Sequence, residues 1–73
     1  MEEKIIQIIN QIRLNKNLEP LINLSKDNDL RRDLDLNSFD LAELTVRIED
    51  EFDIDIFEDG LVSTIEEIYK KLS

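Results

Sequence analysis

The sequence contains no cysteine and no histidine among its 73 residues. Without cysteine, disulfides and thiolate chemistry are excluded, and without histidine there is neither an imidazole metal ligand nor a histidine general base. We do not expect an enzyme, because the hydroxyl groups of the chain have no activating base. The composition is compatible with a reducing compartment, and we expect a cytoplasmic protein.

Glycine and proline occur once each, and only four residues are aromatic. Hydrophobic residues make up 41% of the chain and are mostly isoleucine and leucine. This composition suits packed helices better than a sheet, which requires turns. A chain of this length supports one hydrophobic core. We therefore expect a single all-α domain spanning residues 1–73.

The sequence also lacks a long hydrophobic run. No stretch reaches the roughly 20 apolar residues of a membrane-spanning helix. The first residues, MEEKIIQIINQ, begin acidic and mix polar with apolar side chains, so they do not read as a signal peptide. The sequence predicts a soluble protein with no membrane span.

Basic residues are outnumbered by acidic residues, nine to 18, which gives a net charge of −9. Residues 33–59 hold eleven of the acidic residues and a single basic residue, Arg47. This concentrated negative charge repels nucleic acid and anionic membranes and favours a basic protein partner. The alternative is an acidic, solvated surface that maintains solubility.

Apolar periodicity predicts three clear helices. The first covers residues 2–14 and the second covers residues 38–51. The third follows a capping box, Ser63-Thr64-Ile65-Glu66, and includes Leu61 on its apolar face.

A long mixed segment, residues 15–35, separates the first two helices and contains Pro20. Its many Asn and Asp residues are typical of turns. We expect the segment to contain a short helical turn and to wrap around the core. Its predicted core residues are Leu18, Leu21, Ile22, Leu24 and Leu30.

The middle helix has two different faces. The predicted core stripe is Leu41, Leu44, Thr45, Ile48 and Phe52. On the opposite face Phe39 and Val46 lie one heptad apart, and Glu43 and Asp50 flank them. An apolar centre with a charged rim predicts a docking surface, although single exposed apolar residues are also normal.

Ser38 lies where this helix begins, within the stretch LDLNSFD. One interpretation is that Asn37 or Ser38 caps the helix, with its side-chain oxygen accepting a hydrogen bond from a backbone N–H. Because no histidine exists and no lysine is near in the sequence, another enzyme must act on Ser38 if the hydroxyl is to react.

The run Asp33-Leu34-Asp35-Leu36-Asn37 resembles the opening of an EF-hand loop, which binds calcium. Ser38 stands where that loop requires glycine, and Leu44 stands where it requires a bidentate glutamate. We therefore expect no calcium loop and no metal site.

Residues 30–56, LRRDLDLNSFDLAELTVRIEDEFDIDI, resemble the centre of an acyl carrier protein. The family pattern apolar-x-x-Asp-Leu-x-x-Asp-Ser-Leu-x-x-x-Glu-Leu, followed by Glu-Phe-x-Ile-x-Ile, aligns without a gap. The resemblance implies a small four-helix bundle with a long first loop and a short third helix. It also implies that Ser38 receives 4'-phosphopantetheine from coenzyme A, and that the thiol of this arm carries acyl or aminoacyl thioesters.

The resemblance further implies the partners of the chain. These are a phosphopantetheinyl transferase and the enzymes that load and unload the carrier, which would dock on the acidic middle helix through basic patches. We expect the carrier itself to be monomeric. The predicted partner-binding residues are Asn37, Phe39, Asp40, Glu43, Val46, Arg47, Glu49 and Asp50.

The chain departs from the family pattern in several places. Asn37 replaces the usual Asp, Phe39 replaces the usual Leu, and Arg47 places a positive charge on an acidic face. The region between Ile56 and Ile65 is shorter than in fatty-acid carriers. These departures favour a specialised, discrete carrier, whose cargo remains open between fatty-acyl, polyketide, D-alanyl and other aminoacyl groups.

The alternative function is an unmodified acidic helical interaction module, which would bind partners without needing Ser38.

Overall fold

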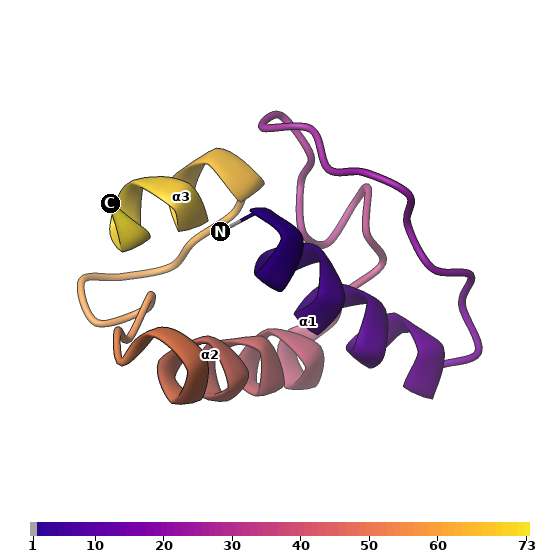
Figure 1. Ribbon diagram of the computed structural model, residues 1–73, viewed down its shortest axis with the longest axis horizontal. Coiled ribbons are helices and arrows are strands. Elements are labelled where there is room, and N and C mark those ends of the chain that lie inside the picture. Colours follow the sequence, from indigo (N-terminus) through magenta and orange to yellow (C-terminus); the bar gives the residue numbers. More distant parts are fainter. Residues whose placement is uncertain (1) are drawn as a thin grey trace.

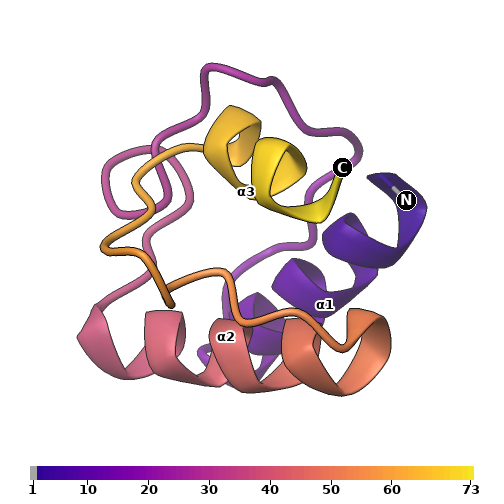
Figure 2. The ribbon, with the colours of Figure 1, turned by 90° about the vertical axis from the view of Figure 1, so that its left-hand side faces the viewer.

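Three helices form the frame of the computed structural model, which describes residues 2–73. They are α1 (Glu2–Asn15), α2 (Ser38–Phe52) and α3 (Ile65–Leu72), and no strand occurs within the described residues. In Figures 1 and 2, α1 and α2 lie side by side and α3 covers the opposite side of the core. The all-α prediction is confirmed.

Helices α1 and α2 form because each presents one apolar stripe to the core. Ile5, Ile9 and Ile12 recur at helical spacing along α1 and are almost completely buried. Along α2, Leu44 and Ile48 are also fully buried. Both stripes face the core as the periodicity predicts, and α1 and α2 contact each other there, so burial of apolar surface fixes α2 against α1. None of the helices within residues 2–73 has the length and apolar character needed to cross a bilayer.

The predicted four-helix count is not confirmed, because the described chain forms turns where the short third helix was expected. In this segment Glu58 N donates a hydrogen bond to Asp55 O at 3.3 Å, and Gly60 N donates one to Phe57 O at 3.2 Å. Each bond joins residues three positions apart, which is typical of single turns. Left-handed Asp53 (φ 60°) and Gly60 (φ 132°) limit the segment on both sides. Few residues remain between them, so a helix cannot extend beyond its first turn.

The long segment between α1 and α2 is held by side chains of α1. Arg13 is only 8% exposed, and its Nε and Nη2 donate to Glu19 O at 3.1 and 3.0 Å. Its Nη1 donates to Leu34 O at 2.7 Å. The Asn10 side chain bonds both the N–H and the carbonyl of Leu21. These bonds satisfy buried polar groups and bind the segment across the core.

The core residues of the segment differ from the predicted set, which did not include Leu34, a core residue that is 2% exposed. Leu30 is buried, while Leu21 and Leu24 pack against the edge of the core. Ile22 was predicted to be a core residue, but it is 96% exposed, so that prediction is wrong. Asn10 holds the backbone of Leu21, and Ile22, the next residue along the chain, faces solvent.

The start of α3 lies one residue later than predicted. Thr64 is the N-cap, and its Oγ1 accepts from Glu67 N at 3.3 Å, while the Glu67 carboxylate accepts from Ser63 N at 3.2 Å. Leu61 is 88% exposed, and Val62, 3% exposed, takes its place in the core. The cause is a short bridge to the long segment, which holds these residues outside the helix.

Candidate functional site

The site begins with the cap of α2, which is made by Asn37 and not by Ser38. Asn37 Oδ1 accepts from Asp40 N at 2.9 Å, and Asn37 N donates to Asp40 Oδ2 at 2.9 Å. This reciprocal pair is a complete capping box. Ser38 is therefore the first helical residue, and its hydroxyl is not needed to satisfy the helix end.

The Ser38 hydroxyl lies at the surface, where the Arg31 guanidinium contacts it. Arg31 Nη2 donates to Ser38 Oγ at 2.8 Å, and both residues are exposed. A guanidinium group donates hydrogen bonds and stays charged, so Arg31 cannot remove the serine proton. The contact with Arg31 therefore leaves the Ser38 hydroxyl without a base that could activate it.

An ion pair fixes the beginning of α2 to the end of α1. Lys16 Nζ lies 2.6 Å from Asp40 Oδ2 and also donates to the Asp35 carbonyl. Burial by itself raises the pKa of Asp40, but the hydrogen bond and charge of Lys16 and the Asn37 N–H outweigh it and hold the pKa below its ordinary value. Asp40, at 8% exposure, therefore stays ionised and anchors the helix on which Ser38 is presented.

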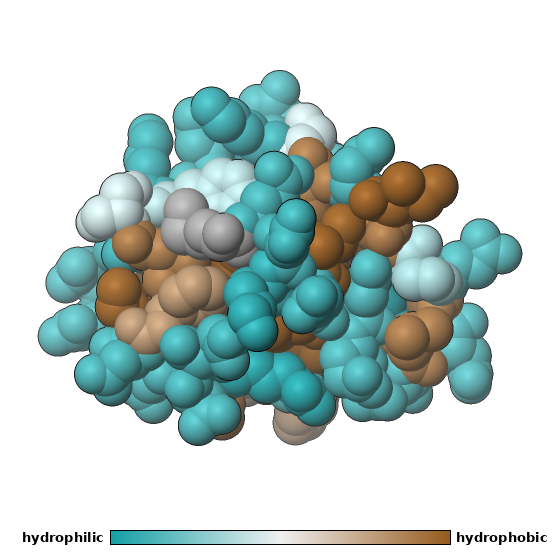
Figure 3. Space-filling model, in the orientation of Figure 1, coloured by the Kyte–Doolittle hydropathy of each residue, from teal (hydrophilic) through white to brown (hydrophobic). Residues whose placement is uncertain are grey.

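The predicted partner-binding residues divide into an inward and an outward group. Asp40 points inward and is used in the cap and the ion pair. Phe39 is 86% exposed and Val46 is 64% exposed, with exposed Glu49 and Asp50 farther along the same helix. We call Phe39, Val46, Glu49 and Asp50 the outer face of α2. In the orientation of Figure 1, α2 follows the lower edge of the molecule, which Figure 3 shows to be mostly hydrophilic.

Arg47 does not stand alone on the acidic helix. Its Nε lies 2.8 Å from Glu43 Oε2, one helical turn away. The pair is partly exposed, and each charge offsets the other. The unneutralised carboxylates of the outer face are consequently those of Glu49 and Asp50, in the second half of α2.

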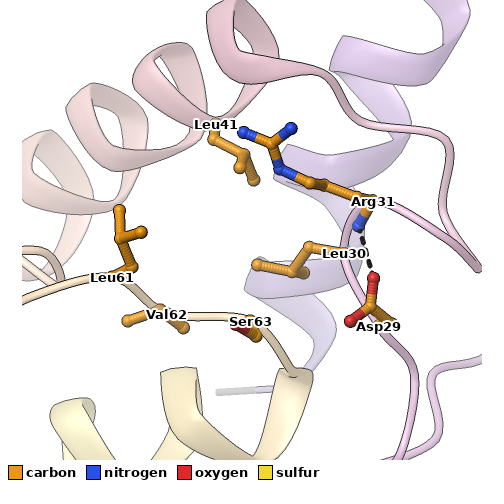
Figure 4. A pocket seen from close by; sticks show the side chains of 7 residues that line it. All are labelled: Asp29, Leu30, Arg31, Leu41, Leu61, Val62 and Ser63. Atoms are coloured by element: carbon orange, nitrogen blue, oxygen red, sulfur yellow. Dashed lines mark hydrogen bonds between the residues drawn. The ribbon is translucent and has the colours of Figure 1, made fainter.

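A small hollow lies beside the start of α2 (Figure 4). It has a volume of about 70 Å³, less than half of the roughly 150 Å³ of an engineered cavity that holds benzene. In this conformation the hollow has no room for a long acyl chain. Its lining residues are Asp29, Leu30, Arg31, Leu41, Leu61, Val62 and Ser63.

In the run that resembles an EF-hand opening, the Asp33 carboxylate binds the backbone. Asp33 Oδ2 accepts from Asp29 N at 2.7 Å, and this backbone bond, ahead of the nearby Arg32 charge, lowers the pKa of Asp33. Within residues 2–73, Asp and Glu side chains form no cluster of three that could hold a metal ion.

Sequence reasoning missed Arg31 and Lys16, whose cationic groups contact the start of α2. Both come from outside the helix, seven and 22 residues before Ser38. In the sequence, the one indication of these contacts is that few basic residues lie near the acidic segment. Periodicity does not reveal which of these cations the loop brings to the helix.

The chain matches the family described as "Phosphopantetheine attachment site" over residues 4–72. No curated protein and no solved structure shows significant similarity to it. An exposed serine hydroxyl beside a guanidinium, with no base of its own, fits the attachment of a phosphate-linked group. The chain therefore belongs to the phosphopantetheine-attachment family, whose members are carrier proteins without catalytic activity that bear covalently attached 4'-phosphopantetheine.

Proposed function

We propose that Ser38 is the attachment residue and that the chain is a discrete acyl or aminoacyl carrier. The observation that carries this proposal is the exposed Ser38 hydroxyl, which is not used in the helix cap because Asn37 forms that cap. In attachment, Ser38 Oγ bonds to the phosphorus that bears the pantetheine of coenzyme A, and the pyrophosphate P–O bond breaks. The adenosine bisphosphate leaves, and the serine proton passes to a base of the transferase. The attached group supplies a thiol for thioester chemistry.

Thiol titration tests this function directly, because the chain has no cysteine. After incubation with coenzyme A, Mg²⁺ and a broad-specificity phosphopantetheinyl transferase, we expect the free thiol content to rise from zero to one per chain. The purified product should then accept an acyl or aminoacyl group as a thioester that hydroxylamine cleaves. A folded chain that gains no thiol with several transferases would instead support the unmodified interaction module.

We further propose that the outer face of α2 docks basic patches of the transferase and of the loading and unloading enzymes. Exposed apolar Phe39 and Val46 give this face a contact centre, and Glu49 and Asp50 give it charge. Asn37 lies beside this face at the cap, while Arg47 and Glu43 form a pair that offers both signs to a partner. Charge complementarity would speed the encounter of a carrier with several successive enzymes.

Reversing the charge of Glu49 and Asp50 tests this docking surface. We expect the double variant Glu49→Lys, Asp50→Lys to be loaded about 10-fold more slowly at low salt, because rim charges act mainly on the association rate. The matched control is Asp27→Lys, Glu66→Lys, which changes the net charge equally at exposed positions outside α2. Initial rates from intact mass would measure the effect. Equal rates for the two double variants would contradict a docking role for this face.

The cargo proposed for the carrier is a fatty-acyl, polyketide, D-alanyl or other aminoacyl group. The match to the family spans residues 4–72, which supports one carrier domain over residues 1–73. The small hollow favours short cargoes that stay outside the core of this conformation. The departures at Asn37 and Phe39 support a specialised carrier, and its monomeric state and cytoplasmic location stay predictions.

A further inference from the structure

Arg31 differs from the other arginines of the chain in what its guanidinium contacts. Arg13 is buried against carbonyl oxygens, Arg32 lies 3.5 Å from Asp33 Oδ1, and Arg47 pairs with Glu43. Arg31 Nη2 instead donates to the uncharged Ser38 hydroxyl, and no ion pair within residues 2–73 includes Arg31. Its charge is thus available to an anion beside Ser38.

The backbone of Arg31 is held in a tight turn. Arg31 N donates to Asp29 Oδ2 at 3.1 Å, and Asp29 N donates to the Asp33 carboxylate at 2.7 Å. Figure 4 shows the Arg31 side chain leaving this turn and extending past Leu30 toward Leu41 of α2. The guanidinium therefore reaches the start of α2 from a fixed base, which lowers the entropy that an ordered contact costs.

We propose that Arg31 binds the phosphodiester of the attached 4'-phosphopantetheine and fixes the direction in which the arm leaves Ser38. This inference rests on the proposed attachment at Ser38. The phosphorus would be bonded to Ser38 Oγ, so its unesterified oxygens lie two bonds from the atom that Arg31 already contacts. A guanidinium fork matches two such oxygens, and the charged contact is stronger than the present contact to a neutral hydroxyl.

The consequence concerns both the charge and the position of the arm. Loading adds a negative charge to a chain whose net charge is already −9, and Arg31 would neutralise that charge locally. Arg31 also lines the hollow next to Leu41 and Leu61. A phosphate held by Arg31 would direct the arm along this side of α2, between the helix and the segment before α3.

The test compares apo and loaded forms of the wild type, Arg31→Gln and the matched control Arg32→Gln, after intact mass has shown complete loading. Loading acts as the second change in a double-mutant cycle. At low salt, we expect the change in Tm on loading to be about 2–4 °C less favourable for Arg31→Gln than for wild type, with Arg32→Gln equal to wild type. This difference should shrink at high salt.

Chemical shifts in nuclear magnetic resonance provide a second measurement, which a general change in stability would leave unchanged. We expect loading to shift the Arg31 Nε–Hε signal and leave that of Arg32 in place, and we expect Arg31→Gln alone to shift the ³¹P resonance. Loaded proteins with equal Tm changes and an unshifted Arg31 signal would overturn this inference and leave the attachment at Ser38 intact. If the wild type gains no phosphopantetheine, the proposed function fails and this inference fails with it.

Discussion

Ser38→Ala is expected to abolish loading, while the wild-type chain gains one phosphopantetheine under the same conditions. The reason is chemical, since the transferred phosphorus requires a hydroxyl oxygen and alanine offers none. Other hydroxyls of the chain do not align with the serine of the family pattern, and the Thr45 hydroxyl donates a hydrogen bond to Leu41 O at 2.9 Å. Intact mass spectrometry after incubation with coenzyme A, Mg²⁺ and a transferase measures the result.

Ser38→Ala removes the hydroxyl without removing the cap of α2. Loss of an N-cap costs about 1 kcal/mol, but Asn37 forms the cap and Ser38 does not. We therefore expect Ser38→Ala to retain the helicity and, within about 0.5 kcal/mol, the stability of the wild type. Thr45→Ala is the matched control and should load fully. Loading of a folded Ser38→Ala protein would contradict the assignment of Ser38.

The second large effect is expected for Asp40→Ala, which should lower the free energy of unfolding by about 2–3 kcal/mol and Tm by about 10–20 °C. One carboxylate completes the capping box with Asn37 and pairs with Lys16, so its removal loses both contacts. It also leaves the partly buried Lys16 ammonium without its carboxylate. Thermal and urea denaturation measure the loss.

The pH dependence of stability provides the control for this assignment. The pKa of Asp40 is lower in the folded chain than its ordinary value, so its contribution is present above the unfolded pKa of about 3.9. That contribution disappears as the pH falls through the folded pKa. Asp40→Asn should therefore lose less stability than the wild type between neutral pH and pH ~3. An Asp40→Ala protein within about 0.5 kcal/mol of the wild type would contradict the anchoring role.

The three helices could be predicted from the sequence because they depend on local signals, and the attachment at Ser38 stays a prediction. Isoleucine and leucine at helical spacing identify the core stripes of α1 and α2, and the contacts agree with them. The family pattern identifies Ser38 as the expected attachment residue. It does not identify the cap, because Asn37 and Ser38 are both favourable caps and only the geometry distinguishes them.

The rest of the site depends on contacts between distant parts of the chain. Arg13 organises the long segment through carbonyl oxygens, which leave no trace in residue type. The sequence pattern places Asp40 among the acidic surface residues, but in the structure Asp40 points inward and pairs with Lys16, 24 residues away. Leu61 and Ile22 are hydrophobic, but both lie outside the helices and are exposed to solvent. Composition and periodicity cannot report such side-chain directions.

Localisation of the modification by peptide fragmentation tests the central claim most directly. Trypsin cleaves after Arg32 and Arg47, and the peptide between these cuts, residues 33–47, contains only two hydroxyl side chains, Ser38 and Thr45. Fragmentation of this peptide from the loaded wild-type chain is predicted to place the whole phosphopantetheine mass on Ser38. Finding that mass on Thr45, or on any other peptide, would contradict the account.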